Sequence, residues 1–189
     1  MKTTPILLYC ILSMTFFSCT SQPKEDQATN TIAPKKASID LLMGSTPKEF
    51  SAKTTDGNLF VSKANKGKFW VIFMYENSYL TKSDSYDLVA ELNETHKLFD
   101  HKIEMIGIAN GFSDDEAVLQ KQFKAAKFNF PQIDNTEGPN KEKQLNDNVF
   151  CTPAKILIDP NGKVIYNGCG GHSNTLNLKL DSLIKANKL

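Results

Sequence analysis

The stretch FWVIFMYENSYLTKSDSYDLVAEL, Phe69 to Leu92, decides the fold class of this chain. Its first seven residues are all apolar or aromatic, which is typical of a strand that is covered on both faces of a sheet. Apolar residues then recur at helical spacing up to Leu92. Three hydroxyl side chains offer N-caps for this predicted helix: Ser78, Thr81 and Ser83. The stretch therefore predicts a buried strand followed by a helix.

Two further apolar segments continue the pattern. The run IEMIGIAN, Ile103 to Asn110, predicts a second buried strand. Ser113 and Glu116 stand in capping-box spacing at the start of a second predicted helix. The short apolar piece FNFPQID comes next, and a polar helical turn is expected around 142–146. Strands that are joined by a helix run parallel, with a right-handed crossover.

Hairpin signals flank these segments. Upstream, Asp56-Gly57 is a strong turn signal between the strand-like residues 50–53 and 59–61. Downstream, PAKILIDPNGKVIYNG predicts two strands joined by a turn over 159–162, and the leucines of SNTLNLKLDSLIKANKL predict a final helix. A tight turn makes its two strands antiparallel. The sequence thus predicts an α/β fold with a mixed central β-sheet flanked by helices and an N-terminal β-hairpin.

The amino terminus has the three parts of an export signal, namely the charged Lys2, an apolar run, and the small Ser18 before Cys19. The apolar run is shorter than the roughly twenty residues that a transmembrane helix needs. The segment MTFFSC resembles a bacterial lipobox, which implies cleavage before Cys19 and a lipid on that residue. The alternative is an ordinary cleaved signal that leaves Cys19 as a free thiol.

The segment after Cys19 is polar, is broken by prolines and has almost nothing to bury, which is typical of a flexible linker. We therefore expect a lipoprotein signal peptide over residues 1–18, a lipid-anchored flexible linker over residues 19–43 and a folded domain over residues 44–189.

The amino-acid composition limits the classes of partner that we expect for the protein. The 189 residues are 40% hydrophobic, which is enough for one normal core. The 22 basic and 21 acidic side chains leave a net charge of +1, and the sequence has no block of Lys and Arg that could follow a phosphate backbone. We expect no nucleic acid partner. The expected partners are the membrane, through a lipid on Cys19, and an envelope protein or peptide.

The region from about Gly44 to Leu189 resembles the thioredoxin-like proteins of the TlpA/ResA and AhpC/TSA (redoxin) groups. Three patterns carry the resemblance: PKEFSAKTTDGNLF, NKGKFWVIFMY and VFCTPAKILIDPNGKVIYNGCGG. The third is the most specific, because its Thr-Pro, its Ile-Asp and its turn Gly occur in order at the spacing of the family. The resemblance implies a thioredoxin-like fold and membership of the thiol-disulfide oxidoreductase and peroxiredoxin-like proteins, with no cofactor.

Residue by residue, the resemblance places the family's cis-proline on Pro153 and the residue before it on Thr152. In the family this site exposes backbone for an extended substrate peptide, whereas the alternative here is an ordinary trans proline that starts a strand. The two cysteines of the family's CxxC motif fall on Ser78 and Thr81. Hydroxyl groups cannot replace the thiolate that attacks a disulfide, so we expect ordinary dithiol exchange to be lost there.

Cys151 and Cys169 remain once Cys19 carries a lipid and the signal peptide is removed. If Ile158 faces Lys163 across the turn, Cys169 lies opposite Thr152 and diagonal to Cys151, so that a disulfide needs a bulge or a local shift. Four interpretations stay open. The pair forms a structural disulfide, a relocated redox couple beside the predicted cis-proline, two free thiols, or a metal site with His172. The last lacks a fourth ligand, and we predict no metal site.

The sequence therefore predicts a lipid-anchored protein of the bacterial cell envelope, on the periplasmic or cell-surface side, from the thiol-disulfide oxidoreductase group. Its ordinary CxxC chemistry is lost, and any remaining redox role falls to Cys151 and Cys169. The alternative function is a non-catalytic module that binds a peptide or a partner protein in the groove at Pro153, where Tyr79 presents an aromatic face.

Overall fold

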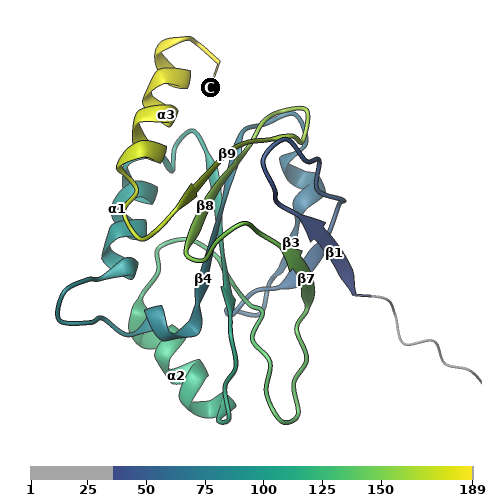
Figure 1. Cartoon of the computed structure of the whole chain (residues 1–189), viewed down its shortest axis with the longest axis vertical. Helices are drawn as coiled ribbons and strands as arrows, with labels where there is room; N and C mark the ends of the chain where they lie inside the picture. The colour runs from purple at the N-terminus through teal and green to yellow at the C-terminus, as the bar shows by residue number, and fades with distance from the viewer. Residues whose placement is uncertain (1–35, 189) are drawn as a thin grey trace, which may run out of the picture. The chain divides into compact units, whose positions relative to one another are not determined.

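A five-stranded mixed sheet lies at the centre of the computed structural model, which describes residues 36–188 (Figure 1). Its strand order is β6-β5-β4-β8-β9. The first three strands run parallel, while β8 is antiparallel to both β4 and β9, so the predicted mixed sheet is confirmed. The five strands are β4 (Trp70–Glu76), β5 (Glu104–Asn110), β6 (Gln132–Asp134), β8 (Ala154–Ile158) and β9 (Val164–Cys169).

The three α-helices cover one face of this sheet, at the left of Figure 1. They are α1 (Leu88–Phe99), α2 (Glu116–Ala126) and α3 (Asn174–Lys185). The crossovers from β4 to β5 and from β5 to β6 step across the sheet in the same direction, and both are right-handed, so α1 and α2 lie on the same side. Their apolar residues pack on alternate residues of β4, including Phe73 and Tyr75.

Short strands cover the opposite face. There β1 (Ala37–Asp40) pairs in parallel with β7 (Leu145–Asn148), and β2 (Ser51–Lys53) pairs with β3 (Leu59–Val61) in the predicted antiparallel hairpin, which the 3-10 helix η1 (Ser62–Asn65) follows. These elements bury the other alternate residues of β4, Ile72 and Met74 among them. The strand is thus covered on both faces, as its apolar run predicts.

The folded region begins before Gly44, which corrects the predicted end of the flexible linker. Residues 37–40 form β1, and the side chains of Ile39 and Leu41 are fully buried against the face of the central sheet that the short strands cover, called the strand face below. The face that the helices cover is called the helix face. Two inward-facing apolar side chains at alternate positions are enough to dock a short strand, even in a polar stretch. The predicted signal peptide, Cys19 and most of the predicted linker lie outside the described residues.

The helix starts also differ from the prediction. A 3-10 turn, η2 (Asn77–Leu80), follows β4, and α1 begins only at Leu88, where Asp87 accepts a hydrogen bond from Ala90 N (2.9 Å). Ser83 is not a cap, because its Oγ accepts a hydrogen bond from Tyr86 N (3.0 Å) within the preceding loop.

Two smaller expectations are wrong as well. Asp115, and not Ser113, caps α2 by accepting hydrogen bonds from Ala117 N and Val118 N. The polar segment expected to form a helical turn leads instead into β7, because pairing with β1 satisfies its backbone. None of the helices within residues 36–188 is long and apolar enough to cross a membrane.

Candidate functional site

A disulfide joins Cys151 to Cys169, with their Cα atoms 5.8 Å apart. Cys169 faces Ala154 across the β8-β9 ladder, so the predicted register, with Cys169 opposite Thr152, is wrong. The irregularity that the disulfide was expected to need is present, because the ladder shifts between Leu157 and Ile158. Cys151 and Cys169 are therefore not free thiols in this structure. No group of three metal-binding side chains occurs among the residues that it describes.

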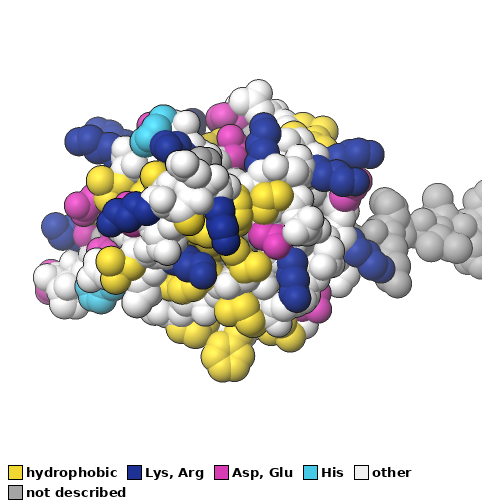
Figure 2. Space-filling view, turned by 90° about the horizontal axis from the view of Figure 1, so that it is seen from above, with side chains coloured by type: hydrophobic (Ala, Val, Ile, Leu, Met, Phe, Trp, Pro, Cys, Tyr) yellow, Lys and Arg dark blue, Asp and Glu magenta, His cyan; other side chains and the backbone are white. Residues whose placement is uncertain are grey.

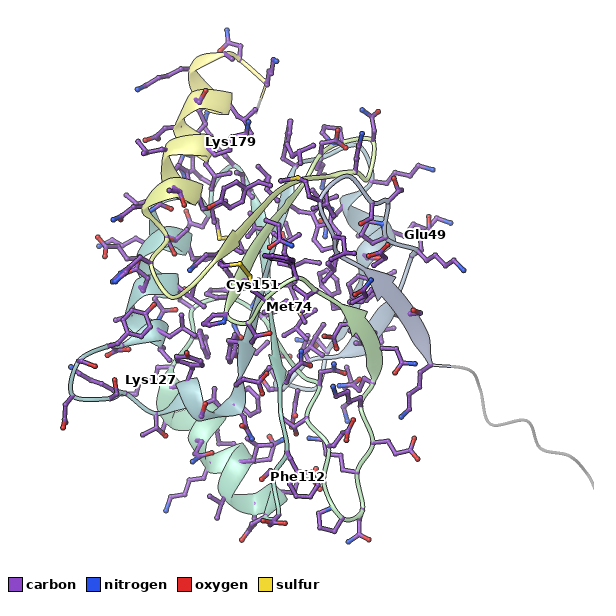
Figure 3. All side chains as sticks on the ribbon, viewed as in Figure 1. Glu49, Met74, Phe112, Lys127, Cys151 and Lys179 are labelled. Atoms are coloured by element: carbon purple, nitrogen blue, oxygen red, sulfur yellow. A yellow bond between two sulfur atoms is a disulfide. The ribbon has the colours of Figure 1, made fainter. Side chains whose placement is uncertain are left out.

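The disulfide encloses the Thr152-Pro153 peptide bond, which is cis. The carbonyl of Pro153 accepts a hydrogen bond from Gly170 N (2.9 Å), so the proline lies directly beside the end of β9. Cys169 is exposed, whereas Cys151 is half-buried against the strand face of the sheet. Figure 3 shows the two sulfur atoms at the label of Cys151, close to β8 and β9. Of the two residues of the disulfide, Cys169 is therefore the more accessible to solvent.

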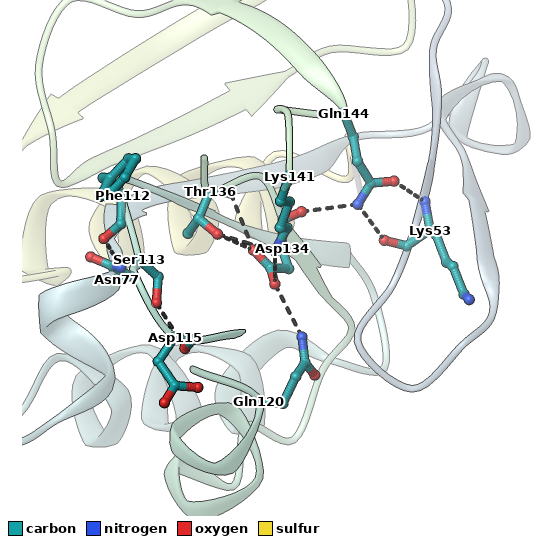
Figure 4. Close-up of polar contacts among 10 residues, drawn as sticks. All are labelled: Lys53, Asn77, Phe112, Ser113, Asp115, Gln120, Asp134, Thr136, Lys141 and Gln144. Carbon is teal, nitrogen blue, oxygen red and sulfur yellow. Dashed lines mark hydrogen bonds and ion pairs between the residues drawn. The ribbon is translucent and has the colours of Figure 1, made fainter. Parts of the chain in front are cut away.

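Ser78 and Thr81 lie at η2, immediately after β4, and both are exposed. Asn77 anchors this turn by donating from Nδ2 to the carbonyl of Phe112 (2.9 Å), as Figure 4 shows. Tyr79 packs edge-on against Tyr86, with ring centroids 6.5 Å apart. Neither hydroxyl side chain stands at the start of an α-helix, where backbone N–H groups would stabilise an anion.

A lysine that the sequence analysis did not single out lies beneath the site. Lys155, the second residue of β8, is 1% exposed, and its ammonium donates a hydrogen bond to the carbonyl of Gly170. Burial lowers the pKa of Lys155 to about 8, against a smaller raising effect of the Glu91 carboxylate. The signal in the sequence was the run AKILI, in which a lysine interrupts an otherwise apolar strand.

Glu91 links helix α1 to the loop after β9. Its Oε1 accepts a hydrogen bond from Ser173 N (2.6 Å), and its Oε2 lies 3.6 Å from Nδ1 of His172. Tyr86 packs edge-on against the His172 ring at a centroid distance of 5.4 Å. Burial raises the pKa of Tyr86 to about 12, and the charge of Glu91 adds to the effect. No local pattern marks Glu91 or Tyr86, since both reach the loop only through the tertiary fold.

A second polar cluster surrounds Asp134 at the end of β6 (Figure 4). Its carboxylate accepts hydrogen bonds from Thr136, Gln120 and Lys141, the last of which also forms an ion pair with it. Because every oxygen of Asp134 is occupied by a protein donor, this cluster fixes β6 to α2 and to the following loop.

The surface carries both basic and acidic side chains, as the nearly balanced numbers of the two kinds in the sequence lead one to expect. On the face shown in Figure 2, basic and acidic side chains are interspersed and apolar side chains lie between them.

The β-α-β-α-β unit, the antiparallel β8-β9 hairpin with its preceding cis-proline and the final helix define a thioredoxin-like protein. The model of the AhpC/TSA family matches residues 43–167. The chain belongs to the AhpC/TSA family.

Solved structures support the same fold. The C-terminal domain of a protein assigned as a thiol-disulfide oxidoreductase from Bacteroides thetaiotaomicron is 21% identical with a TM-score of 0.56, over 77% of this chain and 98% of that one. A thiol-disulfide oxidoreductase from Bacteroides fragilis is 18% identical with a TM-score of 0.55, over 74% and 99%. A DsbF homologue from Corynebacterium diphtheriae is 15% identical with a TM-score of 0.54, over 79% and 88%. Among curated proteins, none matches the chain.

Proposed function

We propose that this protein is a thioredoxin-like protein of the bacterial cell envelope whose thiol-disulfide couple is Cys151–Cys169, and that it performs no ordinary dithiol exchange at Ser78 and Thr81. One observation carries the proposal: the disulfide encloses the cis-proline loop and leaves Cys169 exposed. A couple in this position would meet a partner that docks along Thr152 and Pro153.

The exchange step is a two-electron transfer from a partner dithiol. A thiolate of the partner attacks the sulfur of Cys169, which is the more exposed residue of the pair, the Sγ–Sγ bond breaks, and Cys151 leaves as a thiolate that takes up a proton. The second thiol of the partner then attacks the mixed disulfide and releases Cys169 as a thiol. The partner is oxidised to a disulfide and this protein is reduced to a dithiol.

The cellular place of the protein belongs to the same proposal. A disulfide persists in an oxidising compartment outside the cytoplasm, which fits the export signal that the sequence predicts. We propose a lipid on Cys19 as the anchor to the membrane, with an envelope protein or peptide as the partner of the exposed domain.

Redox titration of the protein tests this function. The thiols of residues 36–189 are counted by mass spectrometry after equilibration in glutathione buffers of graded potential. A midpoint above about −250 mV supports a couple that exchanges with partners, whereas a disulfide that stays closed below about −300 mV is structural and contradicts the proposal. The double variant Cys151→Ser/Cys169→Ser is the control, and it should show no thiol in any buffer.

A second function, a non-catalytic module that binds an extended peptide, is favoured by one specific observation. Phe150 is 79% exposed next to Cys151, and the neighbouring Thr152 is exposed too. Binding of an extended-peptide library should weaken at least about tenfold in Phe150→Ser, because an exposed aromatic side chain is a strong anchor at an interface. Phe112→Ser, at a residue that is 58% exposed after β5, is the matched control. Equal losses in both variants would argue against a site at Pro153.

A further inference from the structure

We infer that Lys155 and Glu91 are positioning residues for the Cys151–Cys169 couple. They hold the loop after β9 so that the two sulfur atoms remain within bonding reach when the disulfide is reduced. This inference rests on the proposed function and adds the two residues that set how readily the couple opens.

Lys155 holds the loop from the face of the sheet opposite to the disulfide. The Cα partners of Lys155 are Phe73 and Gly168, and Phe73 packs on the helix face. The Cα partner of Cys169 is Ala154, which packs on the strand face. Directly paired residues of an antiparallel ladder project to the same side, so Lys155 and Cys169 project to opposite sides. The Lys155 ammonium still reaches the carbonyl of Gly170, the residue after Cys169.

Gly170 is therefore held through both of its backbone polar groups. Its N–H donates to the carbonyl of Pro153 (2.9 Å), and its C=O accepts from Lys155. Both contacts come from β8 or from the residue before it. Because Cys151 lies two residues before Pro153, they fix Cys169 relative to its disulfide partner without using the sulfur atoms.

Glu91 holds the other end of the loop. Its carboxylate accepts a hydrogen bond from Ser173 N (2.6 Å) and lies 3.6 Å from the His172 ring. The residue held by Lys155 is Gly170, at φ +84°, and it is followed by Gly171, where an added Cβ would come within 2.2 Å of the Tyr86 ring. Glycine has the largest conformational freedom of any residue, so this loop depends on its anchors for a defined position.

The anchors act on the equilibrium of the redox step. Reduction adds two electrons and two protons to the disulfide, and a dithiol such as dithiothreitol supplies them as it closes to its cyclic disulfide. Re-formation is intramolecular, so its equilibrium constant scales with the effective concentration of one thiol near the other. A loop that stays anchored after reduction keeps this concentration high. Loss of an anchor should therefore favour the reduced form.

The test measures the equilibrium constant with dithiothreitol at pH 7 for the exported protein and four variants. Lys155→Met and Glu91→Ala should shift the constant towards the reduced form by about threefold to tenfold, the upper value being about 30 mV. Glu91→Gln keeps an acceptor for Ser173 N and should shift it less. Lys141→Met is the matched control, because Lys141 is a half-buried, ion-paired lysine at Asp134, and it should leave the constant unchanged.

The inference is wrong if Lys155→Met and Glu91→Ala unfold cooperatively yet keep the wild-type equilibrium constant. If one of these two variants does not fold, the equilibrium constant of the other decides the question, because each variant removes one anchor on its own. Dithiothreitol opens structural disulfides too, so this measurement remains informative even when the glutathione titration rejects an exchange function. Failure of the proposed exchange function and failure of the positioning role of Lys155 and Glu91 are thus distinguishable.

Discussion

At the scale of single residues, Lys155 is the most unusual position in the described chain. A fully buried lysine in a strand of the central sheet normally costs stability, because burial removes water from its ammonium. Here the carbonyl of Gly170 accepts its hydrogen bond, and Glu91 contributes a compensating charge. One carbonyl and one partly exposed carboxylate offset only part of this cost, which is why the pKa of Lys155 falls to about 8.

This lowered pKa predicts how stability depends on pH. The ordinary pKa of the side chain is 10.5, which we assign to the unfolded chain. Below pH 8 both states are protonated, and the full cost of the buried charge is present. Above pH 8 the folded state loses its proton first, so the unfolded state binds more protons and the free energy of unfolding rises with pH.

Urea unfolding at pH 8, 9 and 10 measures this rise. The range ends near pH 10 because Tyr86, whose pKa is raised from 10.0 to about 12, lowers stability above that pH. Lys155→Met should remove the rise, since an apolar side chain of similar length replaces the group that titrates. The same upward slope in Lys155→Met would show that another group causes it.

At the scale of elements, the segment between β4 and α1 separates this chain from a working dithiol motif. Ser78 lies in a 3-10 turn, and α1 begins only at Leu88. A thiolate at position 78 would therefore lie away from the free N–H groups of the helix, which are what lowers a cysteine pKa.

Restoring the two cysteines should accordingly not restore the chemistry. In Ser78→Cys/Thr81→Cys, made on the background Cys151→Ser/Cys169→Ser, the pKa of the thiol introduced at position 78 should stay near the ordinary value of about 8.5. Insulin reduction should remain at the level of the background protein. Thiolate absorbance followed against pH gives the pKa, and a value below about 7 would mean that the segment rearranges into a helix start when the cysteines are present.

The sequence predicted the order of the major elements but not their edges. Strands β4 and β5 were evident because their nearly uninterrupted apolar residues fit strands that are covered on both faces of a sheet. The start of α1 was missed because Ser78, Thr81, Ser83 and Asp87 are all acceptable caps, and the choice among them depends on the local turn that ties Ser83 to Tyr86. Cap chemistry limits the start of a helix to a few positions, and tertiary packing selects among them.

At the scale of the whole domain, burial of the strand face depends on β1. Ile39 and Leu41 are fully buried, although the sequence around them is polar. A chain that starts at Gly44 would expose the part of the apolar face that β1 covers.

A single substitution tests the contribution of β1. Ile39→Ala should lower the free energy of unfolding by about 2–4 kcal/mol, which is typical for loss of a fully buried isoleucine side chain. Leu42→Ala is the control, since Leu42 is 36% exposed, and it should cost less than about 1 kcal/mol. If urea unfolding shows that Ile39→Ala costs as little as Leu42→Ala, β1 contributes through its backbone pairing and not through the Ile39 side chain.

The candidate site was predictable only where its residues are close in sequence. Cys151, Thr152 and Pro153 are adjacent, and Cys169 returns to them through one hairpin, so their proximity could be argued from a turn. Glu91 reaches the same loop from α1, more than sixty residues upstream of Pro153. Such a contact depends on how α1 packs beside the end of β9, which no local pattern records.

The pairing of β1 with β7 also bears on how the chain reaches its native state. Asp40 and Asn148, which pair at the end of this ladder, are 108 residues apart in the chain. The Cys151–Cys169 link spans only 18 residues, so the β8-β9 hairpin closes at a small entropic cost. Contacts between distant segments form late, because the entropy of closing the intervening loop is lost before the contact stabilises it. The amino-terminal strand would therefore dock last, and until it does, the apolar surface that it covers stays open to chaperones and to other unfolded chains.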